Sequence, residues 1–142
     1  MHDPTNPPTL LEFMATTREA FAFLQRFGFR EIPPPAHRAG DSFQIWFRAD
    51  ERIVVVRGEG HGTAASVTLE HSDGLELAAI HLVPTEHRPG PWRKGKRQSS
   101  QLEQLRTAAS RLEQHAADFL AGDLTRFRAL GKPLPPYKQP LP

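Results

Sequence analysis

The chain has 142 residues, of which 18 are Lys or Arg, 16 are Asp or Glu, 14 are Pro and none is Cys. This length suits a single domain, and the lack of cysteine excludes a disulfide scaffold, a zinc ribbon and a thiol nucleophile. No apolar run approaches the roughly 18–20 residues that a membrane span needs. Because the N-terminus also lacks the basic start and long apolar core of a secretory signal, we expect a cytoplasmic protein with no membrane partner.

Charge is distributed unevenly along the chain. The formal net charge is only +2, yet residues 1–87 hold 7 basic and 12 acidic side chains, whereas residues 88–142 hold 11 basic and 4 acidic ones. The first part therefore carries −5 and the second +7. An asymmetry of this kind can steer a charged partner toward one part of the surface.

Both ends of the chain have the composition of tails. Residues 1–8 contain three prolines and no segment that could be buried, and five of the last ten residues are prolines. Such segments favour extended, polyproline-like structure. The sequence thus predicts an N-terminal tail over 1–8, a single domain over 9–130 and a proline-rich C-terminal tail over 131–142.

The first predicted element is a helix that ends at Gly28. Thr9 with Glu12, and Thr16 with Glu19, both have the spacing of a capping box, so the helix is expected to begin at one of these two places. Apolar residues then recur every three or four positions, which is the pattern of one helical face. Gly28 suits the left-handed conformation that commonly ends a helix.

The middle of the chain has the pattern of an antiparallel sheet. Residues 29–32 can be extended until three prolines follow them, and the next segments alternate or are rich in β-branched residues. These segments are 42–48, 53–57, 63–70 and 75–83, the last of which fits a strand or a short helix equally well. The short connections between them favour a meander of about four strands, because parallel crossovers need about a dozen residues or more.

Helices are predicted again at the C-terminal end of the domain. Ser100 and Glu103 form a capping box, an apolar stripe runs from there to Phe119, and Gly122 ends the helix. A further short helix is expected from Leu124 to Leu130, with Asp123 as its cap. We therefore predict an α+β fold of two layers, in which the N-terminal helix and the C-terminal helices pack on one face of the sheet.

No catalytic motif is recognisable. The glycine-rich stretch 58–62 lacks the patterns of phosphate-binding loops, and no serine lies in a nucleophile elbow. Glu59, Glu70 and Glu86 each lie beside or near a histidine, but these pairs lack the spacing that places two metal ligands on one local element. His81, inside an apolar stretch, is expected to be buried. We predict a protein that is not an enzyme and that has no catalytic residues, no metal site and no cofactor.

The segment 88–97 is the strongest candidate for binding. It combines five cations with one tryptophan and contains no acid, and its residues are Arg88, Trp92, Arg93, Lys94, Lys96 and Arg97. Cations with an aromatic ring can follow a phosphate backbone and stack on a base. Trp and Arg are also enriched at the hot spots of protein interfaces. The partner of this segment can therefore be a protein or, alternatively, a nucleic acid or another polyanion.

At the level of pattern the chain resembles a group of small bacterial α+β proteins, most of them uncharacterised. The shared positions are helix ends and core residues over 10–130, namely Phe21, Phe23, Leu24, Phe27, Gly28, Phe29, Leu120, Gly122 and Asp123. Proteins of this kind include immunity proteins that neutralise toxins, so the resemblance implies a non-enzymatic module that binds a protein partner, of the immunity or accessory type. Inhibitors of nucleic-acid-cutting toxins tend to be acidic, and here only residues 1–87 have that character.

Overall fold

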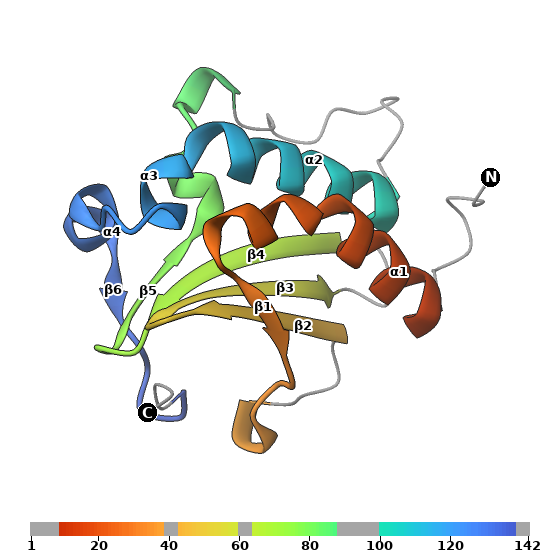
Figure 1. The fold of residues 1–142 in the computed structure, drawn as a ribbon, viewed down its shortest axis with the longest axis horizontal. Coiled ribbons are helices and arrows are strands. Elements are labelled where there is room, and N and C mark those ends of the chain that lie inside the picture. The colour runs from red at the N-terminus through yellow and green to blue at the C-terminus, as the bar shows by residue number, and fades with distance from the viewer. Residues whose placement is uncertain (1–8, 39–42, 60–63, 88–99, 139–142) are drawn as a thin grey trace, which may run out of the picture.

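The computed structural model describes residues 9–38, 43–59, 64–87 and 100–138, and shows an α+β fold (Figure 1). An N-terminal helix precedes a sheet, and further helices follow it, as the sequence predicts. In this described part of the chain, no helix has both the length and the apolar character needed to cross a membrane.

The sheet has six strands, so the expected number of about four is wrong. They are β1 (Arg30–Ile32), β2 (Phe43–Ala49), β3 (Arg52–Glu59), β4 (Ala64–His71), β5 (Leu75–Ala78) and β6 (Lys132–Pro133). They lie in sequence order and every neighbouring pair is antiparallel. The meander topology is therefore as predicted, with two short strands added at its edges.

The strand that the sequence pattern misses is β6, which comes from the proline-rich segment 131–142. Lys132 pairs with Glu76 and Pro133 with Leu75 of β5. Leu134 then donates its backbone N–H to the Gly74 carbonyl at 2.8 Å. A proline is tolerated here because an edge strand needs no donor on its outer side. The described residues 131–138 thus lie along the sheet.

The N-terminal helix α1 (Leu10–Ala20) begins at the first of the two possible caps. Thr9 Oγ1 accepts the Glu12 N–H at 3.1 Å, and the Glu12 carboxylate accepts the Thr9 N–H at 3.1 Å. The chain continues as a 3₁₀ helix, η1 (Ala22–Phe27), and turns at Gly28, whose φ of +87° is the left-handed conformation expected there.

The ambiguous segment 75–83 is divided between two structures. Its first part is β5, and the next residues form the 3₁₀ helix η4 (Ala79–Leu82). Two further 3₁₀ turns, η2 (Ala36–Arg38) and η5 (Thr85–His87), lie between the larger elements.

Three helices follow at the C-terminal end: α2 (Gln101–His115), α3 (Ala117–Leu120) and α4 (Thr125–Leu130). Ser100 caps α2 as predicted, because its Oγ accepts the Glu103 N–H at 3.1 Å. Asp123 Oδ1 accepts the Thr125 N–H at 3.1 Å, so it satisfies a first-turn donor of α4. Gly122, with a φ of +100°, makes the turn between α3 and α4.

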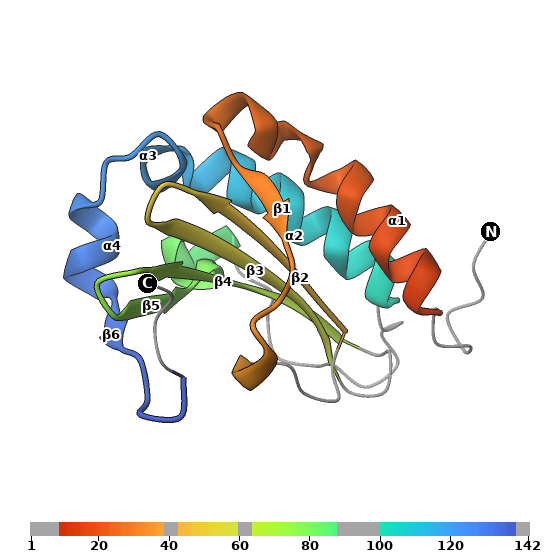
Figure 2. The same ribbon diagram turned by 60° about the horizontal axis from the view of Figure 1, so that its bottom comes forward.

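The two long helices, α1 and α2, lie side by side over one face of the sheet (Figures 1 and 2). Between them and the sheet is the main core, which includes Phe13 of α1, Leu105 of α2 and Leu69 of β4, all fully buried. Because strand side chains alternate in direction, every second residue of each strand points to the other side of the sheet. That second side, here named the outer face, carries the candidate site.

Candidate functional site

The outer face is defined by Ile32 of β1, Trp46 of β2, and Ile53 and Val55 of β3, which form an apolar cluster separate from the main core. Strand pairing places Trp46 between Ile32 and Val55. Trp46 and Val55 have no exposed surface at all. Since α1 and α2 lie on the opposite side of the sheet, this cluster must be covered by other parts of the chain.

The connection between β1 and β2 covers part of this cluster. Arg38 of η2 places its guanidinium 4.8 Å from the centre of the Trp46 ring. Its two terminal nitrogens donate to the carboxylate of Glu70 on β4 at 3.0 and 2.5 Å. Gln44 joins this network, since its Nε2 donates to the Arg38 carbonyl at 3.1 Å and its Oε1 accepts the Trp46 indole N–H at 2.9 Å. The network fixes residues 36–38 against the sheet.

Beside this covered region, two arginines face each other at the edge of the sheet. Arg30 of β1 and Arg48 of β2 are direct cross-strand partners. Like charges placed opposite each other destabilise a sheet by up to about 1 kcal/mol. Among the described residues no carboxylate pairs with Arg30, which is exposed. The Arg30–Arg48 pair therefore places two cationic side chains next to each other on two paired strands.

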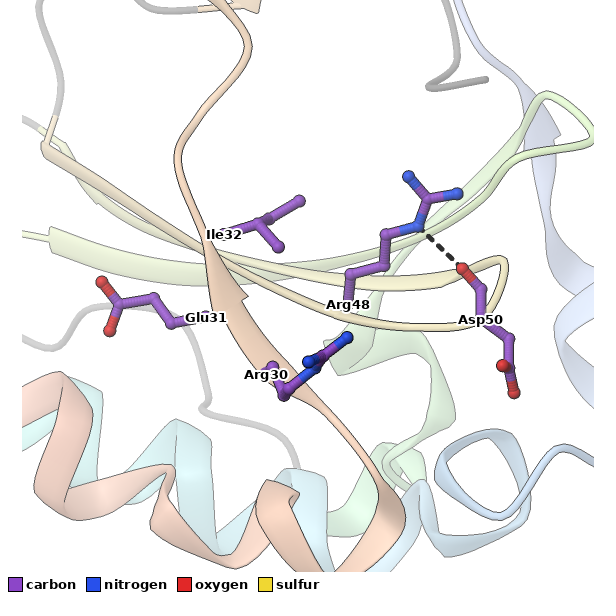
Figure 3. Close-up of a pocket in the computed structure, with 5 residues that line it drawn as sticks. All are labelled: Arg30, Glu31, Ile32, Arg48 and Asp50. Carbon is purple, nitrogen blue, oxygen red and sulfur yellow. Dashed lines mark hydrogen bonds between the residues drawn. The ribbon is translucent and has the colours of Figure 1, made fainter.

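The Arg30–Arg48 pair lines a pocket of about 380 Å³, together with Glu31, Ile32 and Asp50. Figure 3 shows Arg30 and Arg48 on neighbouring strands and Glu31 pointing away from them. Arg48 is oriented by its Nε, which donates to the backbone carbonyl of Asp50 at 2.7 Å (Figure 3). The pocket thus has an apolar base at Ile32 and charged walls.

The two acids at this pocket differ in their surroundings. The Glu31 carboxylate accepts two hydrogen bonds of 2.9 Å from Arg18 of α1, and these bonds lower the pKa of Glu31. Asp50 lies in the two-residue turn between β2 and β3 with a φ of +55°. Its side chain is 91% exposed, and its carboxylate forms an ion pair with Arg52 at 3.7 Å.

The histidines do not form a metal centre in the described residues, where no three His, Asp or Glu side chains lie close enough together to hold a metal ion. His71 is buried, and its Nδ1 accepts the Asp73 N–H at 3.0 Å while its Nε2 lies 3.6 Å from a Glu51 carboxylate oxygen. Its sequence neighbour Glu70 points to the outer face instead. The prediction that His81 is buried is wrong, because η4 turns its side chain outward. His61 lies outside the described residues.

The residues predicted to bind a partner, Arg88, Trp92, Arg93, Lys94, Lys96 and Arg97, all lie outside the described residues. Their role therefore stays a prediction. The Arg30–Arg48 pair was missed by the sequence reasoning. Arg48 ends an alternating segment and Arg30 lies two residues before Ile32, but their pairing depends on the register between two strands.

Comparison of the chain with protein-family models, with curated proteins and with solved structures finds no match.

Proposed function

We propose that this protein is a non-enzymatic protein-interaction module, of the immunity or accessory type, that binds a protein partner through the Arg30–Arg48 pair and its pocket. The observation that carries this proposal is the direct cross-strand placement of two arginines. Arg30 and Arg48 oppose each other on two strands, beside a pocket lined by charged and apolar groups. Arginine is enriched at interface hot spots because its planar group bonds and stacks at the same time.

The rigidity of the surroundings supports the same proposal. Strand β2 is buried between β1 and β3, and the Arg38–Glu70 pair holds the connection next to the pocket. A surface that is ordered before binding loses less conformational entropy when the partner arrives. The pocket lies at the sheet edge and its five lining residues come from β1, β2 and one turn, a size that suits a few side chains of a partner.

Site-specific photocrosslinking tests this function. The variant Asp50→p-benzoylphenylalanine places a photoreactive group at the rim of the pocket, where the side chain is exposed, and Thr107→p-benzoylphenylalanine places it on the exposed side of α2 as a control. In cells that naturally make the protein, we expect a discrete protein adduct from position 50 and none from position 107. The captured protein, once purified, should form a stoichiometric complex with the wild-type chain. Equal labelling from both positions would contradict the proposal.

A second candidate function, binding of a nucleic acid or another polyanion, rests on the five cations and one tryptophan within residues 88–97. It predicts retention on heparin and an affinity that falls steeply with salt. Both should be lost when Lys94→Ala, Lys96→Ala and Arg97→Ala are combined. Heparin retention that is unchanged in this triple variant would contradict this candidate function.

A further inference from the structure

We propose that Trp46 and Glu70 form a binding site for a guanidinium group, which the chain's own Arg38 occupies in the unbound protein and an arginine of the protein partner takes over on binding. Residues 36–38 then act as a strap that moves aside when the partner's arginine enters. This inference rests on the proposed function and adds a second contact next to the pocket, because Ile32 of the pocket is the cross-strand neighbour of Trp46.

The contacts of Arg38 indicate the ligand chemistry that this site selects. The guanidinium of Arg38 lies 4.8 Å from the centre of the Trp46 ring and donates to both oxygens of Glu70, at 3.0 and 2.5 Å. A planar cation that lies over an indole and forms two hydrogen bonds with one carboxylate is characteristic of arginine. Lysine has no planar fork, and a neutral side chain would leave the Glu70 charge buried without a partner.

The two walls of the site are positioned by the sheet and not by Arg38. Trp46 is on β2, which lies between β1 and β3, and Glu70 is on β4, which lies between β3 and β5. The indole is oriented by its N–H, which donates to Gln44 Oε1 at 2.9 Å. Both walls therefore keep their places when Arg38 leaves.

Arg38, in contrast, comes from a connection at the surface. Ala36 and His37, the other two residues of η2, are exposed, so residues 36–38 form an outer layer over the sheet. The whole connection spans the ten residues 33–42, whereas antiparallel neighbours can be joined by about two to five. The added length allows residues 36–38 to move while β1 stays paired with β2.

Exchange of one arginine for another costs little at the site itself. The incoming guanidinium makes the hydrogen bonds and the ring contact that Arg38 gives up, so the Glu70 carboxylate is not left buried and unpaired. The remaining cost is the movement of residues 36–38, which the rest of the interface offsets. Apolar side chains of similar volume often stabilise a fold as well as a buried ion pair does. A guanidinium held at this position therefore fits a role in binding.

The charges around the site also favour a cationic ligand. Glu76 of β5 is the direct cross-strand partner of Glu70, so two carboxylates lie next to each other on the outer face. Lys138 lies 3.5 Å from Glu76 Oε2, and this buried oxygen accepts no hydrogen bond in the part of the chain that the structure describes. Once Arg38 moves out, two carboxylates face Lys138, and a cation is favoured there over an anion.

Titration of the Arg38→Ala variant with capped peptides tests this inference. The probe is acetyl-Gly-Arg-Gly-amide, and its controls carry lysine, or citrulline as a neutral isostere, in place of the arginine. In a Trp92→Phe background the fluorescence of Trp46 reports binding. Arg38→Ala should bind the arginine peptide about tenfold or more tightly than the chain with Arg38 does, because the internal competitor is gone. The lysine and citrulline peptides should bind this variant about tenfold or more weakly than the arginine peptide.

Two further variants separate this site from the rest of the surface. Glu70→Gln, added to Arg38→Ala, should remove binding of the arginine peptide because the carboxylate is lost. Arg106→Ala, a change at an exposed arginine of α2, should bind the arginine peptide no better than wild type does. Equal affinity of Arg38→Ala and wild type for the arginine peptide would overturn the inference, as would equal affinity of Arg38→Ala for the arginine and citrulline peptides.

A measurement on the unaltered protein covers the case in which Arg38→Ala does not fold. In the ¹⁵N-labelled wild type, the arginine peptide should move the Nε–Hε signal of Arg38 toward that of the exposed Arg106 in a saturable way. The lysine peptide should leave the Arg38 signal in place. An Arg38 signal that does not move throughout the arginine titration would overturn the inference.

The inference and the proposed function fail in different ways. A purified partner that binds wild type and Arg38→Ala equally well, and leaves the Arg38 signal in place, would overturn the exchange of Arg38 and leave a protein-interaction module. Peptide binding that depends on Glu70, with no protein captured at position 50, would support the guanidinium site and count against the proposed function.

Discussion

Arg38 and Glu70 form an ion pair whose side chains are each only 2% exposed, although they are separated by 32 positions in the sequence. The guanidinium donates to both carboxylate oxygens and at the same time covers the Trp46 ring. Arg38 comes from the connection that follows β1, and Glu70 from β4, two strands beyond β2. This pair therefore fastens residues 36–38 across the outer face and shields its apolar cluster.

Glu70→Gln should destabilise the protein by about 3–5 kcal/mol, because it leaves the Arg38 charge buried without its partner. Urea unfolding at neutral pH measures this loss. In a Trp92→Phe background Trp46 is the one remaining tryptophan, and its fluorescence should shift to the red if residues 36–38 separate from the ring.

The matched control for this prediction removes both charges. Arg38→Met combined with Glu70→Leu should recover most of the lost stability, since two well-packed apolar residues replace two desolvated charges. Exposed ion pairs contribute less than about 1 kcal/mol. If Glu70→Gln lowers the free energy of unfolding by no more than this, the Arg38–Glu70 pair does not hold residues 36–38 against the sheet in solution.

The helix ends of this fold can be predicted from sequence because their determinants are local. Thr9 and Ser100 each accept the N–H of the residue three positions later. Gly28 and Gly122 adopt the positive φ angles that glycine tolerates without strain. Alternation along 42–48 and the β-branched run at 53–57 likewise predict strands from neighbouring residues alone.

The outer face cannot be predicted in the same way, because it depends on contacts between distant segments. Ten residues, 33–42, separate β1 from β2, and a connection of that length leaves the register of Arg30 against Arg48 open. A shift of one residue would turn Arg30 to the opposite face. Strand β6 has no strand pattern, since its pairing with β5 relies on the fold bringing the C-terminal segment to that edge.

Gly58→Ala should destabilise the protein by about 1–3 kcal/mol through overpacking. A Cβ at this position would lie 2.7 Å from Gln101 Nε2 and 2.8 Å from a ring carbon of Phe13. Gln101 cannot move away without loss, because its Nε2 donates to the Ala64 carbonyl at 2.7 Å. Chemical denaturation of the two proteins measures the difference.

A double-mutant cycle isolates the cause of this effect. In a Gln101→Ala background the additional cost of Gly58→Ala should become smaller, since one of the two close contacts is gone while the Phe13 contact remains. An unchanged cost would show that the contact with Phe13 of α1, and not the one with Gln101 of α2, makes the substitution unfavourable.

The Asp118–Arg126 ion pair should make the stability of the protein depend on pH in the acidic range. Hydrogen bonds from Arg126, at 2.8 and 2.7 Å, lower the pKa of Asp118. A carboxylate whose pKa is lowered by folding stabilises the protein at neutral pH, and this contribution disappears as the pH falls through the folded-state pKa. Asp118→Asn should therefore cost about 1 kcal/mol at pH 7, a value kept small by the half-exposed Arg126. The difference in Tm from wild type should shrink as the pH is lowered below about 4.

Glu19→Gln is a suitable control for this pH series, because it removes an exposed carboxylate of α1 that has no such partner in the described residues. Its Tm should follow that of the wild type throughout. A gap between Asp118→Asn and wild type that stays constant down to about pH 2 would contradict a role for the Asp118 charge.

Arg30 and Arg48 should differ in their effect on stability although they face each other. Arg30→Gln removes the repulsion between the two cations and breaks no ion pair in the described residues, so the free energy of unfolding should stay the same or rise by about 0.5 kcal/mol. Arg48→Gln removes the same repulsion but also breaks the Nε bond to the Asp50 carbonyl at the turn, so it should lower the free energy of unfolding by about 0.5 kcal/mol. Urea unfolding of both variants measures the contrast. A residue that is kept for binding often lowers the stability of the fold, so its removal does not destabilise the protein. If Arg30→Gln lowers the free energy of unfolding by more than about 1 kcal/mol, Arg30 has a structural role instead.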